Sequence, residues 1–148
     1  MSYAMMAIRV VLVDDSPAPE KALQLPLAAD RSIQLVSVVS TYMEAIWQCT
    51  AVEPDVVILN LSPSEKGSTE AAIEISKRSP NTKALIVSDL TDAEHIHSAL
   101  EAGVRGYLAS ENAPRMLVAT VKRLHSGATV LGPVAAKAIA CQGSSPYL

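Results

Sequence analysis

Five polar residues stand where apolar segments of the sequence end: Asp14, Asp15, Asn60, Ser88 and Ser110. Carboxylate oxygens are ligands for hard cations such as Mg²⁺. Asn60 stands among them as the amide isostere of an aspartate. An amide nitrogen is not nucleophilic and its oxygen carries no full charge, so this position cannot attack phosphorus as a carboxylate can. The residue types therefore predict a polar site in which position 60 supplies no nucleophile.

Alternating apolar and amphipathic segments separate these residues. Arg9 is the only charge in the first apolar run. Nearly continuous apolar runs are typical of strands that are buried on both faces of a parallel sheet. Strands are predicted at Ile8–Val13, Ile33–Val39, Val56–Asn60, Ala84–Val87 and Gly106–Ala109.

Capping signals place helices between these strands. Ser16-Pro17 predicts the start of the first helix, with Ser as the cap and Pro at the first helical position. Capping boxes that begin at Thr41 and Thr91 predict the starts of the second and fourth. Helices are expected at about residues 16–30, 41–53, 68–78, 91–102 and 114–125, with Ala72, Ile73 and Ile75 facing inward on the third.

Five βα units with right-handed crossovers predict an α/β fold, a flavodoxin-like (βα)5 doubly wound parallel sheet with strand order 2-1-3-4-5. In that order the first and third strands are neighbours, about 4.8 Å apart. The carboxyl ends of the strands meet at one edge, around the point where such sheets bind ligands. We therefore expect the five polar residues to converge at this edge.

Three segments carry a family resemblance: Asp14-Asp15, Pro54-Asp55-Val56-Val57-Ile58-Leu59-Asn60-Leu61 and Gly106-Tyr107-Leu108. Over about residues 7–126 the sequence resembles the receiver domain of two-component response regulators of the NarL/FixJ (LuxR-type) group. It is an atypical form, because Asn60 stands at the phosphoacceptor aspartate and Ser110 at the pocket lysine. The loop after Asn60 also lacks the family's Met and is one residue shorter.

The resemblance implies a role for each site residue. In receivers an acid pair and the acceptor aspartate hold Mg²⁺, a hydroxyl and a lysine bind the phosphoryl group, and an aromatic side chain reports the state of the site. Asp14 and Asp15 match the acid pair, Ser88 the hydroxyl and Tyr107 the switch aromatic. With a neutral Asn60 and a shortened loop, we expect Mg²⁺ to bind weakly or not at all at Asp15 and Asp14, and we expect no other cofactor.

These residues also have structural interpretations. Asp14 and Asp15 favour the positive end of the helix that follows. Ser88 is typical of strand-end hydroxyls that bond to the backbone, and Tyr107 is expected to be half-buried packing. Asn60 can both donate and accept hydrogen bonds, so it is able to bridge Asp15 and Ser88 without metal.

Other conspicuous side chains give weaker signals. His95 and His97 are two residues apart on a helix, so they point to different faces and are expected at the surface. Trp47 is expected to face outward, either as a partner contact or packed on its own helix. Cys49 and Cys141 form no CxxC pair, and reduced thiols in a cytoplasmic protein are the simplest account.

Composition is typical of one globular domain. The 148 residues are 49% hydrophobic and include no Phe, so the core must consist of Val, Ile, Leu and Ala. A net charge of -3 gives no electrostatic reason to expect nucleic-acid binding by this segment alone. No apolar run is long enough for a membrane span, and residues 1–7 lack the features of a secretion signal.

The chain is predicted to comprise an N-terminal extension or cloning remnant at residues 1–7, the receiver at 8–127 and a linker at 128–148. A short linker helix is expected at Val134–Ala140. In the regulators that the sequence resembles, a LuxR-type helix-turn-helix DNA-binding domain follows. No such domain is seen in these 148 residues, so DNA contact is expected only through a domain beyond them.

The sequence leaves three functions to consider. The first is a receiver that controls transcription without phosphorylation, through homodimerisation, a small-molecule ligand or a protein partner. The second is a stand-alone adaptor that binds a kinase or another protein. The third, a small α/β enzyme or cofactor binder, is disfavoured because no glycine-rich phosphate loop follows the first strand, so we expect no enzymatic activity. Related homodimers use either the first and fifth helices or the fourth helix, fifth strand and fifth helix, and the sequence does not choose between these faces.

Overall fold

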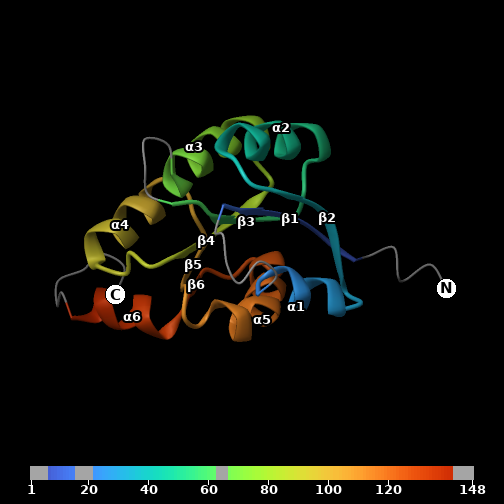
Figure 1. Ribbon diagram of the computed structural model, residues 1–148. Coiled ribbons are helices and arrows are strands. Elements are labelled where there is room, and N and C mark those ends of the chain that lie inside the picture. The colour runs from blue at the N-terminus through green and yellow to red at the C-terminus, as the bar shows by residue number, and fades with distance from the viewer. Residues whose placement is uncertain (1–6, 16–21, 63–66, 142–148) are drawn as a thin grey trace.

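The computed structural model describes residues 7–15, 22–62 and 67–141. A parallel sheet lies between two layers of helices (Figure 1). Its strands run in the order β2-β1-β3-β4-β5-β6, which confirms the predicted order 2-1-3-4-5 and adds a sixth strand at the β5 edge. The strands are β1 (Ile8–Asp14), β2 (Ile33–Val39), β3 (Val56–Asn60), β4 (Lys83–Ser88), β5 (Gly106–Ala109) and β6 (Val130–Leu131).

Six helices connect or follow the strands in the described residues. They are α1 (Gln24–Ala29), α2 (Tyr42–Val52), α3 (Ser68–Arg78), α4 (Ala93–Glu101), α5 (Ala113–His125) and α6 (Pro133–Ala140). Within the described ranges, none is both long and apolar enough to cross a membrane.

The first helix is shorter than predicted. The expected start at Ser16-Pro17 lies outside the described residues, Ala22 and Leu23 form a turn, and α1 begins at Gln24. Pro26 accounts for this start, because its ring nitrogen has no hydrogen to donate to the carbonyl four residues earlier and is tolerated only in the first turn. The helix can therefore contain Pro26 only by beginning close to it.

Side-chain caps mark the starts of α2 and α4. The Thr41 cap is confirmed, because its hydroxyl accepts from the Glu44 N–H at 3.1 Å. The second bond of the box is displaced by one residue, since the Glu44 carboxylate accepts from the Ser40 N–H at 3.2 Å. The Thr91 box is wrong by one residue, because Asp92 caps α4 and its carboxylate accepts from the N–H of His95. Aspartate is among the strongest N-caps, and its charge is favoured at the positive end of a helix.

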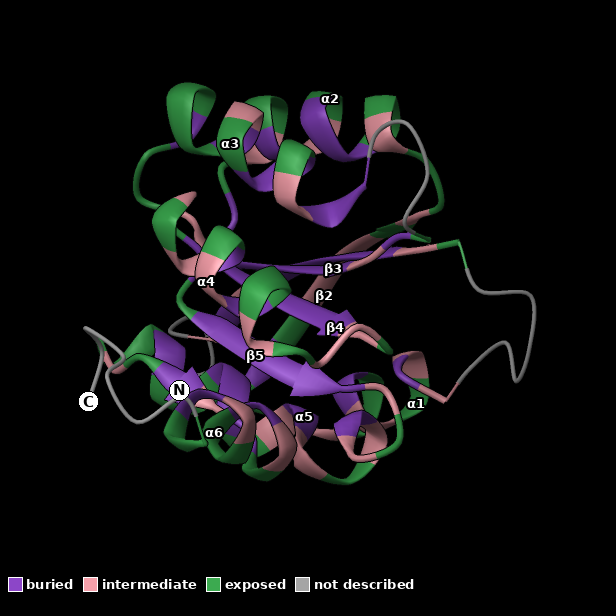
Figure 2. Cartoon of the chain, turned by 90° about the vertical axis from the view of Figure 1, so that its left-hand side faces the viewer, coloured by how far each residue is buried: buried purple, intermediate pink, exposed green. Residues whose placement is uncertain are grey.

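Two apolar cores fill the space between the sheet and its helices. One lies between the sheet and α2, α3 and α4, and the other between the sheet and α1 and α5. The central strands β1, β3, β4 and β5 are largely buried, whereas the edge strand β2 is mostly half-buried or exposed and the outer helix faces are exposed (Figure 2). On α3, Ala72 and Ile75 are buried as predicted, but Ile73 is 38% exposed because it lies one residue round the helix from Ala72. Trp47, at 71% exposed, faces outward as expected.

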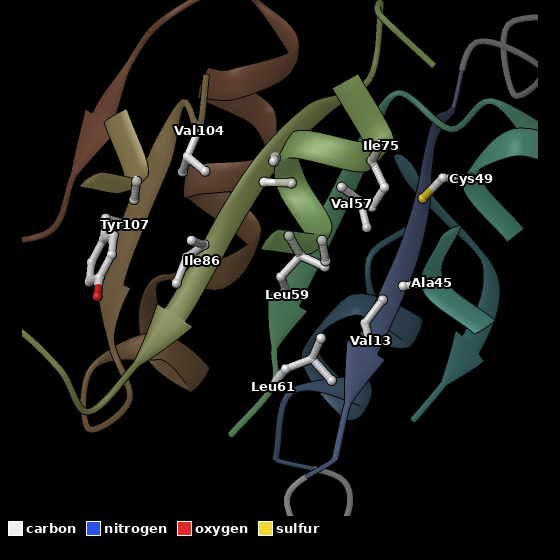
Figure 3. Close-up of a cluster of buried hydrophobic side chains, with 14 of the residues drawn as sticks. Val13, Ala45, Cys49, Val57, Leu59, Leu61, Ile75, Ile86, Val104 and Tyr107 are labelled. Carbon is white, nitrogen blue, oxygen red and sulfur yellow. The ribbon is translucent and has the colours of Figure 1, made fainter. Parts of the chain in front are cut away.

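Cys49 belongs to the core beneath α2 (Figure 3). Burial raises the pKa of its thiol to about 12, so the reactive thiolate form is disfavoured. Cys141 is exposed, and both thiols are free. Cys49 therefore acts as a small apolar side chain.

The tail that was expected to be a linker is packed against the sheet as far as residue 141. β6 pairs in parallel with β5, and Ala135 and Ile139 of α6 are buried in the same core as α4. The linker helix predicted at 134–140 is present as α6. The sixth strand was not predicted, because a strand of two residues is too short to show strand periodicity. The prediction that residues 128–148 lead to a DNA-binding domain stays a prediction.

Candidate functional site

The parallel sheet places all five predicted site residues at the carboxyl ends of its strands. Asp14 and Asn60 end β1 and β3 and stand opposite each other in the pairing of these strands. Ser88 ends β4 opposite Ala109, and the N–H of Ser110 donates to the Ser88 carbonyl at 3.0 Å. The site thus consists of an acidic half at β1 and β3 and a hydroxyl half at β4 and β5.

Asn60 and Asp14 are joined by a direct hydrogen bond. The Nδ2 of Asn60 donates to Oδ1 of Asp14 at 3.1 Å, and both residues are half-buried. A bond between an amide N–H and a carboxylate is charge-assisted and stronger than a neutral pair. With a carboxylate at position 60, two like charges about 4 Å apart would repel by about 1 kcal/mol in water and about 4 kcal/mol near a protein surface. The amide removes this repulsion and supplies a donor in its place.

Asp15 is held by the loop that follows β3. Its two carboxylate oxygens accept from the backbone N–H and the hydroxyl of Ser62, at 2.8 and 3.1 Å. The predicted bridge from Asn60 to Asp15 and Ser88 is wrong. The amide N–H of Asn60 donates to Asp14, and the hydroxyl of Ser88 accepts from the N–H of Leu90. The acidic half is therefore organised by two separate donors, one for each carboxylate.

Tyr107 lies in the core next to the hydroxyl half of the site. Its ring is 3% exposed, so it is buried and not half-buried as predicted, and it lies beside Ile86 in the core (Figure 3). Its hydroxyl donates to the carbonyl of Leu90, whose N–H donates in turn to the hydroxyl of Ser88 at 2.9 Å. Tyr107 and Ser88 thus hold the same short connection between β4 and α4.

The carboxylates of the acid pair are engaged in hydrogen bonds within the site. Both oxygens of Asp15 accept hydrogen bonds from Ser62, and the amide N–H of Asn60 faces Asp14. Among the described residues, no group of three His, Cys, Asp or Glu is placed to hold a metal ion. Mg²⁺ requires near-octahedral oxygen ligands. Asp14 and Asp15 keep further oxygen lone pairs beside these hydrogen bonds, whereas the neutral Asn60 adds no charge for a cation.

The sequence of residues 10–122 matches the protein family described as the response regulator receiver domain. The chain belongs to this family. The match spans β1 to most of α5, so it includes every strand end that carries a site residue.

Several curated proteins are similar to this receiver domain. It is 28% identical over 120 residues to the uncharacterised transcriptional regulatory protein YhcZ of Bacillus subtilis, covering 81% of this chain and 56% of that protein. It is 25% identical over 128 residues to the response regulator protein VraR of Staphylococcus aureus, covering 86% of this chain and 61% of that protein. The chain therefore spans little more than half the length of these relatives.

Solved structures share the receiver fold. The crystal structure of a LuxR-family two-component response regulator from Aurantimonas sp. SI85-9A1 covers 93% of this chain and 98% of its own, with a TM-score of 0.86 and 24% identity. The signal receiver domain of the putative response regulator NarL from Mycobacterium tuberculosis covers 82% of this chain and 98% of its own, with a TM-score of 0.76 and 22% identity. At these identities the likeness establishes the fold.

A cavity of about 300 Å³ adjoins the hydroxyl half of this receiver's site. It lies between the start of α3 and α4, and the side chains that line it include Ser68, Ser88, His95, Ser98 and Tyr107. Ligand pockets in proteins begin at about this size. The His95 ring also bonds to Asp92 through Nδ1 at 2.6 Å, on the exposed start of α4. The hydroxyl half thus has room for a small polar molecule beside Tyr107.

Sequence reasoning missed two residues of the site. Ser62 holds Asp15, and the backbone of Leu90 joins Ser88 to Tyr107. The only signal for Ser62 is its place in the loop directly after β3, where a hydroxyl can reach a neighbouring strand end. Leu90 contributes peptide groups, which every residue possesses, so its side chain carries no signal.

We predict that the phenol of Tyr107 ionises above the ordinary tyrosine pKa of about 10. Burial raises its pKa, a hydrogen bond with Ser88 opposes this, and the charge of Asp92 raises it further. Because the unfolded chain releases this proton at lower pH than the folded chain, stability is unaffected below pH about 10 and falls as pH rises beyond it. The difference between the tyrosinate absorbance titrations of wild type and Tyr107→Phe isolates this phenol. A midpoint at or below the ordinary value contradicts the prediction.

Proposed function

We propose that this chain is an atypical receiver domain of a transcriptional response regulator that signals without aspartyl phosphorylation. The observation that supports this best is the bond from Asn60 Nδ2 to Asp14 Oδ1. It places an uncharged, non-nucleophilic group at the acceptor position and engages the neighbouring carboxylate directly. Ser110 stands where the family has its lysine, so the usual cation for a bound phosphoryl group is missing as well.

Transcription is the proposed output because the similar curated proteins are named as transcriptional regulators. DNA contact would come from a helix-turn-helix domain beyond residue 148, since nothing in the net charge of -3 favours binding by the receiver itself. Receiver domains are signalling modules, and we propose no enzymatic activity for this one.

The proposed input is a small molecule or a protein partner. The cavity beside Tyr107 supports a small molecule, because hydroxyl groups line it together with Glu70 and apolar side chains, and because it adjoins the connection bonded to Ser88. The second candidate is an adaptor that binds another protein, favoured by the exposed Trp47 and Met43, which are four residues apart on α2. The length of the parent gene separates the two, since only the regulator requires a DNA-binding domain.

We predict that acetyl phosphate with Mg²⁺ leaves the wild-type chain unmodified. Asn60 offers no nucleophile, so intact-mass measurement after incubation should show no added phosphoryl group. Asn60→Asp alone should restore little, because Ser110 still stands at the lysine position. Asn60→Asp with Ser110→Lys is the matched comparison, since it returns both missing groups. A stable phosphoryl group on wild type that maps to a strand-end residue of the site contradicts the proposal.

We predict that Mg²⁺ stabilises the wild-type fold only slightly. A ligand present at its dissociation constant adds about 0.4 kcal/mol, so millimolar Mg²⁺ should raise the melting temperature by about one or two degrees at most. Asn60→Asp should respond more strongly, because its added carboxylate faces Asp14 and a cation relieves that repulsion. A large rise for wild type that Asp15→Ala abolishes would show that the metal site is intact.

We predict that the homodimer forms without a phosphate mimic. If the covalent input is closed, the dimer equilibrium cannot depend on occupation of the acceptor position. Sedimentation velocity with and without beryllofluoride and Mg²⁺ measures this, and both samples should show the same dimer fraction. A chain that is monomeric alone and dimerises only with beryllofluoride refutes phosphorylation-independent signalling.

A further inference from the structure

The sixth βα unit occupies the edge of the sheet next to β5. The N–H groups of Val130 and Gly132 donate to the carbonyls of Arg105 and Tyr107, both at 2.9 Å. A Cβ on Gly132 would lie 2.9 Å from Cδ2 of Leu108, so the chain approaches β5 as closely as a glycine allows. In a five-stranded receiver this edge is free to contact a partner, whereas here the chain itself covers it (Figure 1).

α6 continues this cover onto α4. Ala135 and Ile139 are fully buried and share one core with Ile96 and Ala99 of α4. α6 contacts α4, β5 and β6. The surface formed by α4 and β5 is therefore occupied from within the chain.

Tyr107 connects this cover to the site. Its backbone carbonyl accepts from the N–H of Gly132, the residue before α6. Leu131 of β6 pairs with Tyr107 of β5. Its hydroxyl holds Leu90, which is bonded to Ser88. One residue thus bonds to the β4–α4 connection through its side chain and to the β6–α6 connection through its backbone.

We propose that β6 and α6 form the output element of this receiver, and that the docking of α6 depends on the position of Tyr107 and the β4–α4 connection. Movement of Leu90 or of the Tyr107 ring removes packing beneath α4, and Ile139 loses its neighbours in the shared core. The state of the site is then passed along the chain to whatever follows α6, without a second chain docking on α4 and β5. That α6 carries an output signal rests on the proposed function. The coupling between Tyr107 and α6 itself needs neither phosphate nor ligand.

Hydrogen–deuterium exchange of the full chain tests the coupling. Tyr107→Phe keeps the ring and removes only the hydroxyl that holds Leu90, so it should raise exchange in α6 by about two- to tenfold, the range for one lost hydrogen bond. Because coupling is reciprocal, Ile139→Ala should raise exchange in residues 89–101. Tyr42→Phe is the matched control, since Tyr42 packs against the same core from α2, and it should leave α6 unchanged.

Exchange in α2 distinguishes coupling from general loss of stability. The proposal holds if α6 responds to Tyr107→Phe and residues 89–101 respond to Ile139→Ala, while α2 stays constant in both. It is overturned if α6 is unchanged in Tyr107→Phe, or if α2 and α6 rise equally. No phosphodonor is present, so the coupling can fail while the phosphorylation result stands, and the reverse also holds.

Discussion

β1 and β3 are hydrogen-bonded neighbours in register, so their carboxyl ends hold Asp14 and Asn60 face to face. This pairing follows from the strand order and is independent of the residue type at position 60. A carboxylate there would repel the charge of Asp14 unless a cation or a retained proton neutralised one of the two groups. An amide needs neither, because it donates a hydrogen bond to the carboxylate. One oxygen-to-nitrogen change thus replaces a repulsion between two carboxylates by a hydrogen bond.

The remaining site contacts agree with this arrangement. Asp15 is held by the N–H and hydroxyl of Ser62, and the loop after β3 is thereby anchored to the end of β1. At the other half, Ser88 and Tyr107 both hold Leu90. The amide N–H of Asn60, both oxygens of Asp15 and the hydroxyl of Ser88 have partners within the chain. No described buried side-chain polar atom lacks a partner. The site is ordered by its own hydrogen bonds.

Features that depend on residue type and strand periodicity could be predicted from the sequence. The ends of β1, β3, β4 and β5 were predictable because buried parallel strands are continuous apolar runs that stop at polar residues. The partners of those polar residues were not, since the choice between Asp14 and Asp15 for Asn60 depends on differences of a few ångströms in side-chain placement. The cap of α4 was misplaced for a similar reason, because Thr91 and Asp92 are both good caps and neighbours.

The sixth βα unit could not be predicted from the sequence for a different reason. β6 has two residues and gains its stability from the hydrogen bonds that β5 offers, so it exists only in the context of the finished sheet. The burial of Tyr107 has the same origin, because Leu131, Ala135 and Ile139 cover a face that a five-stranded sheet would leave open. Elements that are stabilised mainly by tertiary contacts are difficult to predict from local sequence patterns.

Loss of the carboxylate and the lysine together has a simple electrostatic consequence. Three carboxylates and one ammonium carry a net charge of -2, and so do Asp14 and Asp15 alone. Under the proposed function the net charge is preserved and the covalent input is absent, so the site would change state through a ligand or partner with different affinities for its arrangements. A molecule that draws Ser62 away from Asp15, or that fills the cavity beside Tyr107, would act on contacts that differ between arrangements. A molecule that binds every arrangement equally well shifts nothing, however tightly it binds.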